Sequence, residues 1–206
     1  MVAVAKPPYI SPHEYLERER AAIYKSEYFA GTIYAMSGAS EAHNLICANI
    51  VGELWAQFKG KTCKVYNSDM KVRTATTGLY AYPDVTALCD EAHFDDRHKD
   101  VLLNPTVVFE VLSPSTEAYD RGKKFGHYQH IASLTDYVLI SQERMRLERY
   151  QRQTDGSWRY TSHEDSEERI HFATPECVMR LADIYDKVEF PACLEENALP
   201  GYPPLA

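Results

Sequence analysis

The sequence predicts a single domain of the α/β (α+β) class, with a central mixed β-sheet flanked by helices. Its 206 residues suit one domain, and helical and strand patterns are interspersed along them. Two near-continuous apolar runs, residues 106–112 and 136–140, are typical of strands buried on both faces of a sheet. Hydrophobic residues make up 45% and charged residues 25% of the chain, proportions that exclude disorder for most of it.

The N-terminal part predicts a helix followed by a hairpin. The motif Ser11-Pro12-His13-Glu14 is a helix start, because Ser can cap, Pro fits the first helical position and Glu can reach back to the cap. Residues 24–36 alternate around a central Ala-Gly pair, which is typical of a β-hairpin.

A second helix completes this helix–hairpin–helix segment. Ser40 can cap its N-terminus, and Gly60 can end it. Residues spaced by three or four positions share one face of this helix: His43, Cys47, Ile50, Leu54 and Phe58. We expect this face to be buried.

The middle of the chain predicts most of the sheet. Strands are expected at residues 62–66, 70–73, 82–88, 106–112 and 136–140. A polar loop covers residues 89–100. A helix is expected between the two buried strands, from Ser115 or Thr116 through Ile131.

The C-terminal part predicts a second hairpin and a short tail. Residues 145–152 and 157–162 flank a Thr-Asp-Gly turn, which indicates a C-terminal β-hairpin extension. A short strand is expected near His171. We expect the core of the single domain to cover about residues 10–190, with residues 191–206 as a surface appendage.

Charge and cysteine content limit the possible partners and location. The net charge of −8 argues against a nucleic-acid partner, but residues 161–206 carry ten acids and three bases, so the rest of the chain is nearly neutral. The sequence has no long apolar run and no recognisable secretory signal, so no membrane association is expected. Five widely spaced cysteines without a Cys-x-x-Cys pair argue against a disulfide framework and a structural zinc site, and favour a cytoplasmic location.

Glu110 is the most informative single residue, because it lies inside the apolar run at residues 106–112. Burial of an ionised carboxylate costs several kcal/mol unless a positive charge offsets it. Two interpretations follow: a structural salt bridge, or a metal-binding or catalytic role.

Asp84 is the candidate partner of Glu110. Alone, the pair Pro83-Asp84 is more typical of a turn or cap. Together with Glu110 on a later strand, however, Asp84 could hold a hard divalent cation such as Mg²⁺. That cation could activate water and stabilise charge on a phosphate.

The helix after Glu110 supplies a candidate cation. Asp120 and Lys124 are spaced as an i,i+4 pair, so a surface salt bridge is one interpretation. Because the helix begins close to the end of the strand that carries Glu110, a long lysine side chain could also reach back over it.

These motifs together resemble one known family. The segments that carry the resemblance are Pro83-Asp84, Phe109-Glu110-Val111-Leu112-Ser113-Pro114-Ser115-Thr116 and Asp120-Arg121-x-x-Lys124-x-x-x-Tyr128. They are similar to the Uma-type putative restriction endonuclease family of the PD-(D/E)XK nuclease superfamily, over roughly residues 10–190. The resemblance implies a restriction endonuclease-like fold, Mg²⁺-dependent cleavage of DNA with Mn²⁺ as a possible substitute, and Asp84 and Glu110 as metal ligands.

The resemblance also implies roles for residues outside the two acids. The wider superfamily has Lys two residues after the second acid, where this chain has Leu112. The resemblance implies that the lysine comes instead from the following helix. Lys124 is the better match for it, and Lys123 is the alternative. Glu27 is implied as a third metal-site carboxylate or a partner of Lys124, and His43 as a group that positions water or phosphate. From the residues alone, Glu27 could equally be solvated and His43 could be a hydrogen-bonded core histidine.

The leading hypothesis is therefore a Mg²⁺-dependent DNA endonuclease. The alternative is a non-catalytic nucleic-acid-binding or accessory protein that keeps the fold. A two-carboxylate glycosidase is a third interpretation, which the sequence neither supports nor excludes. Cleavage of both strands of a duplex needs two active sites or two encounters, so a homodimer is plausible.

Overall fold

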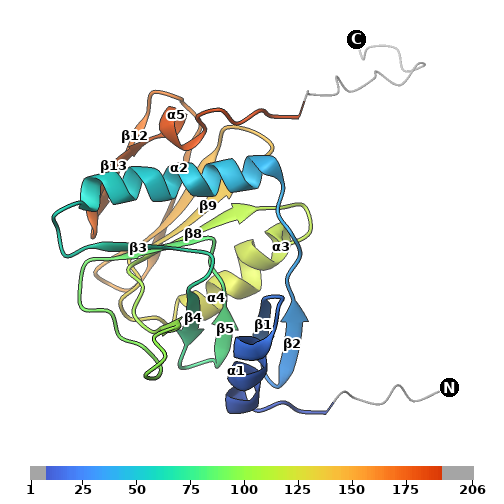
Figure 1. Ribbon diagram of the computed structural model, residues 1–206. Helices are drawn as coiled ribbons and strands as arrows, with labels where there is room; N and C mark the ends of the chain where they lie inside the picture. Colours follow the sequence, from blue (N-terminus) through green and yellow to red (C-terminus); the bar gives the residue numbers. More distant parts are fainter. Residues whose placement is uncertain (1–7, 192–206) are drawn as a thin grey trace, which may run out of the picture.

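The computed structural model describes residues 8–191, which fold into two β-sheets, a separate hairpin and a few helices (Figure 1). The helices are α1 (Pro12–Ala21), α2 (Glu41–Phe58), α3 (Glu117–Tyr119), the π-helix η1 (Asp120–Lys124), α4 (Phe125–Tyr128) and α5 (Leu181–Ile184). The predicted α/β class is thus confirmed, and the helix expected after residue 115 forms as the continuous series α3, η1 and α4.

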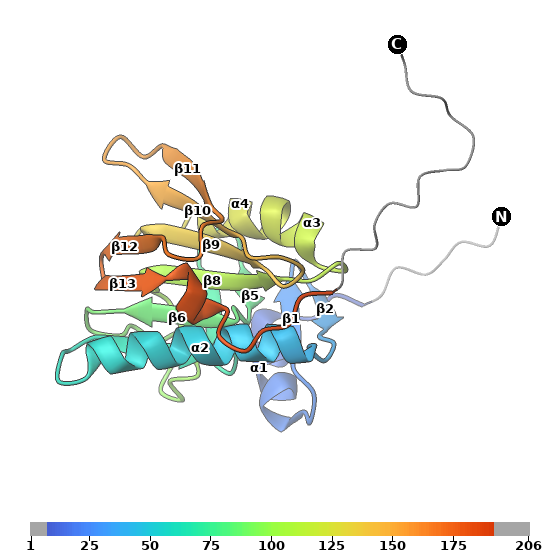
Figure 2. The same cartoon turned by 90° about the horizontal axis from the view of Figure 1, so that it is seen from above.

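The larger sheet has six strands in the order β11-β10-β9-β8-β6-β3. The strands are β3 (Lys64–Asn67), β6 (Val85–Leu88), β8 (Val107–Leu112), β9 (Asp136–Ser141), β10 (Leu147–Arg152) and β11 (Trp158–His163). Only β8 and β9 pair in parallel, so the sheet is mixed. Helix α2 covers one face, and α3 and α4 lie on the opposite face (Figure 2). Both apolar runs are therefore buried as central strands, as the sequence predicts.

A second sheet departs from the prediction of one central sheet. Its five strands have the order β2-β1-β5-β4-β7, and only β4 and β7 pair in parallel. They are β1 (Ser26–Phe29), β2 (Thr32–Ala35), β4 (Lys71–Thr74), β5 (Leu79–Ala81) and β7 (Val101–Leu102). The strand predicted at residues 82–88 begins only at Val85, because the chain passes from the second sheet to the first around Pro83, which has no N–H for a ladder.

The two helix caps and the hairpin turn predicted in the N-terminal part of the chain are confirmed. Ser11 Oγ accepts a hydrogen bond from the Glu14 N–H at 3.2 Å, and Ser40 Oγ accepts one from the His43 N–H at 3.1 Å. The hairpin between β1 and β2 turns at Ala30 and Gly31, both with positive φ (49° and 86°), as a type I′ turn requires. Helix α1 packs its buried side on this second sheet.

The C-terminal region contains more structure than predicted. The hairpin of β10 and β11 is confirmed. Instead of one short strand near His171, a second hairpin forms from β12 (Arg169–Ala173) and β13 (Glu176–Arg180). It packs with α5 against α2, so its apolar side chains extend the core on that face of the larger sheet. The appendage predicted at residues 191–206 lies outside the described residues, except for Pro191.

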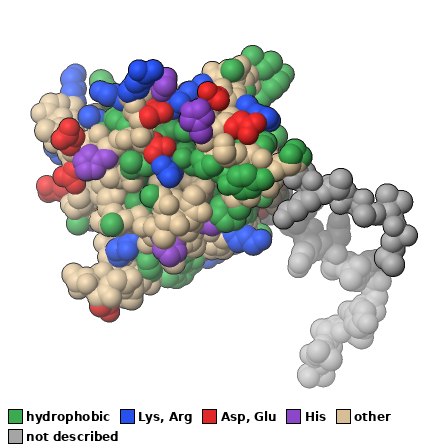
Figure 3. Space-filling view, turned by 90° about the horizontal axis from the view of Figure 1, so that it is seen from below, with side chains coloured by type: hydrophobic (Ala, Val, Ile, Leu, Met, Phe, Trp, Pro, Cys, Tyr) green, Lys and Arg blue, Asp and Glu red, His purple; other side chains and the backbone are tan. Residues whose placement is uncertain are grey.

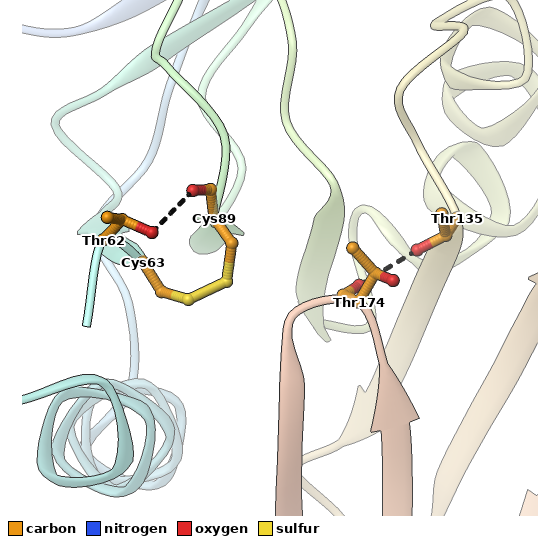
Figure 4. The surroundings of a disulfide bond; sticks show 5 residues. All are labelled: Thr62, Cys63, Cys89, Thr135 and Thr174. Atoms are coloured by element: carbon orange, nitrogen blue, oxygen red, sulfur yellow. Dashed lines mark hydrogen bonds between the residues drawn. A yellow bond between two sulfur atoms is a disulfide. The ribbon is translucent and has the colours of Figure 1, made fainter.

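One disulfide joins Cys63 and Cys89 at the edge of the larger sheet (Figure 4). The register of β3 and β6 pairs Lys64 with Leu88, so the next two residues outward face each other. The sequence argued against a disulfide framework, and this bridge corrects that expectation for two of the five cysteines. Their separation of 26 residues leaves no local pattern, since only the strand pairing brings them together. Within residues 8–191, no helix is long and apolar enough to span a bilayer.

Candidate functional site

A cleft of about 1350 Å³ lies between the β1–β2 hairpin and three other elements: the N-terminus of α2, the end of β8 and the helical segment of α3 and η1. All five residues predicted for the site line it: Glu27, His43, Asp84, Glu110 and Lys124. They come from five different parts of the chain, and the fold brings them to one cleft.

Asp84 and Glu110 lie at the same end of two antiparallel strands. Val85 of β6 pairs with Phe109 of β8, so Asp84, which directly precedes β6, comes close to Glu110. Asp84 Oδ2 accepts a hydrogen bond from the Val111 N–H at 2.7 Å, which fixes the carboxylate against β8. Both acids therefore line the cleft at this end of the sheet.

Lys124 lies among three carboxylates. Its Nζ is 2.9 Å from Glu110 Oε1, 3.4 Å from Asp120 Oδ1 and 3.5 Å from Glu27 Oε1. Lys124 is only 5% exposed, whereas Lys123 is exposed, so of the two lysines Lys124 belongs to the acidic cluster. The i,i+4 pair of Asp120 and Lys124 exists, but it is buried rather than on the surface.

Hydrogen bonds from neighbouring elements hold this cluster. Tyr128 Oη donates to Glu110 Oε1 at 3.3 Å, and the Tyr82 N–H donates to Glu27 Oε1 at 3.1 Å. Two further contacts fix η1 against the sheet: Tyr137 Oη donates to the Asp120 carbonyl at 2.9 Å, and Arg121 Nη2 lies 2.5 Å from Glu148 Oε2 of β10. A π-helix at this point is a feature often found at functional sites.

The cluster contains more negative than positive groups. Burial raises the pKa of Glu110 well above its usual value, and the charges of Asp120 and Asp84 add to this effect against the opposing charge of Lys124. Burial likewise raises the pKa of Asp120. Burial lowers the pKa of Lys124, but Glu110 and Glu27 outweigh it and raise that pKa well above the usual value. Lys124 therefore stays charged, and one lysine does not balance the acids around it.

This donor set fits a hard divalent cation. Mg²⁺ and Mn²⁺ prefer carboxylate oxygens, and Asp84 and Glu110 offer two from adjacent strands. Burial is the main cause of the raised pKa of Glu110, the charges of Asp120 and Asp84 add to it, and a bound cation would favour the ionised carboxylate.

His43 lies on the other side of Asp84. Its Nε2 is 3.3 Å from Asp84 Oδ1, and its Nδ1 is 3.6 Å from Cys47 Sγ. Burial raises the pKa of the Cys47 thiol, with added contributions from Asp84 and Glu110. Sequence reasoning placed Cys47 only on the buried face of its helix. Its spacing of four from His43 was the signal that the two side chains could act together.

Two basic residues of β4 form ion pairs within the fold. Lys71 is buried and lies 3.1 Å from Asp100 Oδ2, and Arg73 pairs with Asp95, so both are neutralised within the fold. Figure 3 shows acidic and basic side chains interspersed on one face of the molecule. A DNA substrate would thus meet no uniformly basic surface on that face.

The fold is a mixed α/β architecture whose cleft holds several acids around one lysine. The family model described as "Putative restriction endonuclease", Uma2, matches residues 12–181. The chain belongs to this family.

The chain is also similar to other proteins in sequence and in fold. Two uncharacterized proteins of Synechocystis sp. (strain ATCC 27184 / PCC 6803 / Kazusa) are similar to the chain. One, slr1290, is 39% identical over 160 residues, covering 78% of this chain and 83% of that protein. The other, sll1609, is 35% identical over 173 residues, covering 84% and 98%. A crystal structure of a putative nuclease belonging to DUF820, from Anabaena variabilis ATCC 29413, matches with a TM-score of 0.71 at 15% identity, covering 87% of this chain and 99% of that one. At this identity the match shows a shared fold.

Proposed function

We propose that this protein is a Mg²⁺-dependent DNA endonuclease that hydrolyses phosphodiester bonds in the cleft. The observation that supports this most strongly is the surplus of acids: Glu110, Asp120 and Glu27 surround Lys124, and Asp84 lines the same cleft. A purely structural ion pair needs one acid for one lysine. A site that takes a divalent cation needs the surplus.

Asp84 and Glu110 would hold the cation, Mg²⁺ or Mn²⁺. A bound ion of this kind lowers the pKa of water and stabilises negative charge on a phosphate. The Val111 N–H fixes Asp84, and Tyr128 and Lys124 fix Glu110, so both carboxylates are oriented before any ligand arrives.

Lys124 acts as a fixed positive charge. Because its pKa is raised, it does not serve as a proton acceptor at neutral pH. Its ammonium would donate hydrogen bonds to the scissile phosphate or to the attacking water, and so stabilise the charge that develops there. Glu27 and Asp120 hold the ammonium in place from two sides.

His43 would contact water or phosphate at the mouth of the site. Its Nε2 faces Asp84, which orients the ring. The cleft is lined mostly by acids and neutral groups, so we expect the cation to be required for DNA binding as well as for cleavage. A homodimer would supply the two sites that cleavage of both strands requires.

Nicking of supercoiled plasmid tests the proposal. The wild type should nick with Mg²⁺ or Mn²⁺ and stop in EDTA. Asp84→Asn should abolish nicking, while Asp90→Asn, which alters an exposed acid outside the cleft lining, should not. If wild type binds DNA in the presence of the cation without cleaving it under any metal condition, the non-catalytic alternative is correct instead.

A further inference from the structure

The side chains of His43, Cys47 and Asp84 form a second group that the nuclease chemistry does not use as a whole. One ligand atom from each lies within 4.8 Å of the others. Within residues 8–191, this is the one group of three or more His, Cys, Asp or Glu side chains with that geometry. It contains a thiol, which distinguishes it from the all-carboxylate donor set of Asp84 and Glu110.

The fold fixes the three ligand atoms independently. His43 and Cys47 are four residues apart on α2, so their side chains lie one turn apart on the same face of the helix. Asp84 is tied to the end of β8 by the Val111 N–H. All three residues are half-buried and line the cleft, so an ion could reach them.

The distance between Cys47 Sγ and His43 Nδ1 matches that between two ligands of a tetrahedral ion. Zn–N and Zn–S bonds of about 2.0 and 2.3 Å give a separation of about 3.5 Å between the two ligand atoms. Cys47 Sγ and His43 Nδ1 are 3.6 Å apart. If Nδ1 of His43 binds the ion, Nε2 faces Asp84 at 3.3 Å in the carboxylate–histidine arrangement that is common around bound zinc. Binding through Nε2 would instead bring Asp84 into the first coordination sphere.

We propose that Cys47, His43 and Asp84 form a binding site for a thiophilic divalent cation of the Zn²⁺ class. Binding replaces the proton of the Cys47 thiol, which is released to solvent, and forms a sulfur–metal bond. Mg²⁺ does not take sulfur ligands, so it cannot use this site.

The site has a regulatory consequence, which rests on the proposed function. Asp84 takes part in both sites, because it either binds the second cation directly or accepts the hydrogen bond from His43 Nε2. A cation bound by Cys47 and His43 therefore competes for the carboxylate that holds Mg²⁺. Zn²⁺ therefore inhibits the Mg²⁺-dependent reaction, and the inhibition depends on Cys47.

Cobalt spectroscopy tests the binding site without any need for activity. The full-length protein is stripped with EDTA, kept free of thiol reductants, and titrated with Co²⁺. Wild type should develop the near-ultraviolet charge-transfer band of a thiolate–Co²⁺ bond, and Zn²⁺ should remove it. Cys177→Ser, which alters a buried free cysteine elsewhere in the core, should keep the band, and Cys47→Ser should lose it. No band in the wild type, or a band that persists in Cys47→Ser, overturns the proposal.

Inhibition by Zn²⁺ tests the regulatory step. Each variant is compared with its own Mg²⁺-dependent nicking rate, and Cys47→Ser should need about tenfold more Zn²⁺ for half inhibition. Equal inhibition of both proteins would refute competition through Cys47. If no protein nicks DNA at all, the proposed function fails, while the cobalt result still decides whether the site exists.

Discussion

Substitution of Glu110 by Gln separates a metal site from a structural ion pair. Gln keeps the shape of the side chain and removes its charge. The remaining acids around Lys124 decide the outcome, because Asp120 and Glu27 stay 3.4 and 3.5 Å from its Nζ. Gln Oε1 can still accept hydrogen bonds from Lys124 and Tyr128. The substitution therefore leaves no buried lysine without a partner.

The charges indicate the sign of the effect. At an effective dielectric constant of 20, the attraction between Glu110 and Lys124 at 2.9 Å is about 6 kcal/mol. Repulsion by Asp120 and Asp84 offsets part of this attraction, and the several kcal/mol needed to desolvate the carboxylate are saved when the charge is removed. The raised pKa of Glu110 agrees with this balance. We expect the unfolding free energy of the metal-free protein to stay unchanged or to rise by about 1–3 kcal/mol.

Thermal melts in EDTA and in Mg²⁺ measure the change in unfolding free energy caused by Glu110→Gln. For a chain of this length, each kcal/mol shifts the Tm by about 2–4 °C. Wild type should gain about 2.7 kcal/mol when Mg²⁺ reaches a hundred times its Kd, and Glu110→Gln should lose this gain together with nicking. A clear fall of the Tm in EDTA would refute the reasoning, because it would identify Glu110 and Lys124 as a structural pair worth about 3–5 kcal/mol.

Glu148→Gln is the matched control. Glu148 is also a buried glutamate on the larger sheet, but it faces Arg121 at 2.5 Å and Arg146 at 3.0 Å. Burial raises its pKa, yet hydrogen bonds from Arg121 and Tyr160 outweigh burial and lower it, the opposite of Glu110. Both arginines are partly exposed, so we expect a loss of about 1–3 kcal/mol, equal in EDTA and in Mg²⁺.

Three further predictions follow from the same structure. Lys124→Ala should lose nicking but keep its stabilisation by Mg²⁺ in thermal melts, since the lysine is not a metal ligand. Lys123→Ala, at an exposed position, should nick normally. The reverse result would show that Lys123 fills the catalytic role. DNA affinity measured with Ca²⁺ in place of Mg²⁺ should fall steeply with added salt, because most contacts would be to phosphates, and a salt-insensitive complex would indicate another substrate class. The hydrogen bond from Arg20, with Lys71, lowers the pKa of Asp100 to about 2, so its stabilising effect is present above the unfolded pKa of about 3.8 and is lost as pH falls through about 2. Melts of wild type and Asp100→Asn should therefore differ at neutral pH and converge near pH 2, and a constant difference would contradict this assignment.

Local patterns in the sequence predicted local structure well. The caps at Ser11 and Ser40 and the turn at Ala30-Gly31 depend on neighbouring residues alone, and all are confirmed. The division into two sheets could not be predicted in this way. Strand alternation shows which face is buried but does not identify the neighbouring strand, so the crossing between sheets at Pro83 escaped detection.

The residues that line the cleft could be predicted from the sequence, but part of their arrangement could not. Motif resemblance selected residues that the fold does bring to one cleft, although their metal-binding and catalytic roles stay predictions. It did not indicate that Asp120 would be buried with Lys124, because an i,i+4 pair has the same spacing on a buried or an exposed helix face. Cys47 was not predicted as a metal ligand for a similar reason. Its spacing of four from His43 is the same whether it belongs to an apolar helical face or to a metal site.

Anomalous diffraction from crystals grown with Mn²⁺ tests the central claim most directly. The account predicts a manganese peak between the carboxylates of Asp84 and Glu110, at ligand distances of about 2.0–2.6 Å, with Lys124 beside it. No peak at that position at saturating Mn²⁺, with Glu110 still paired only to Lys124, would contradict the account.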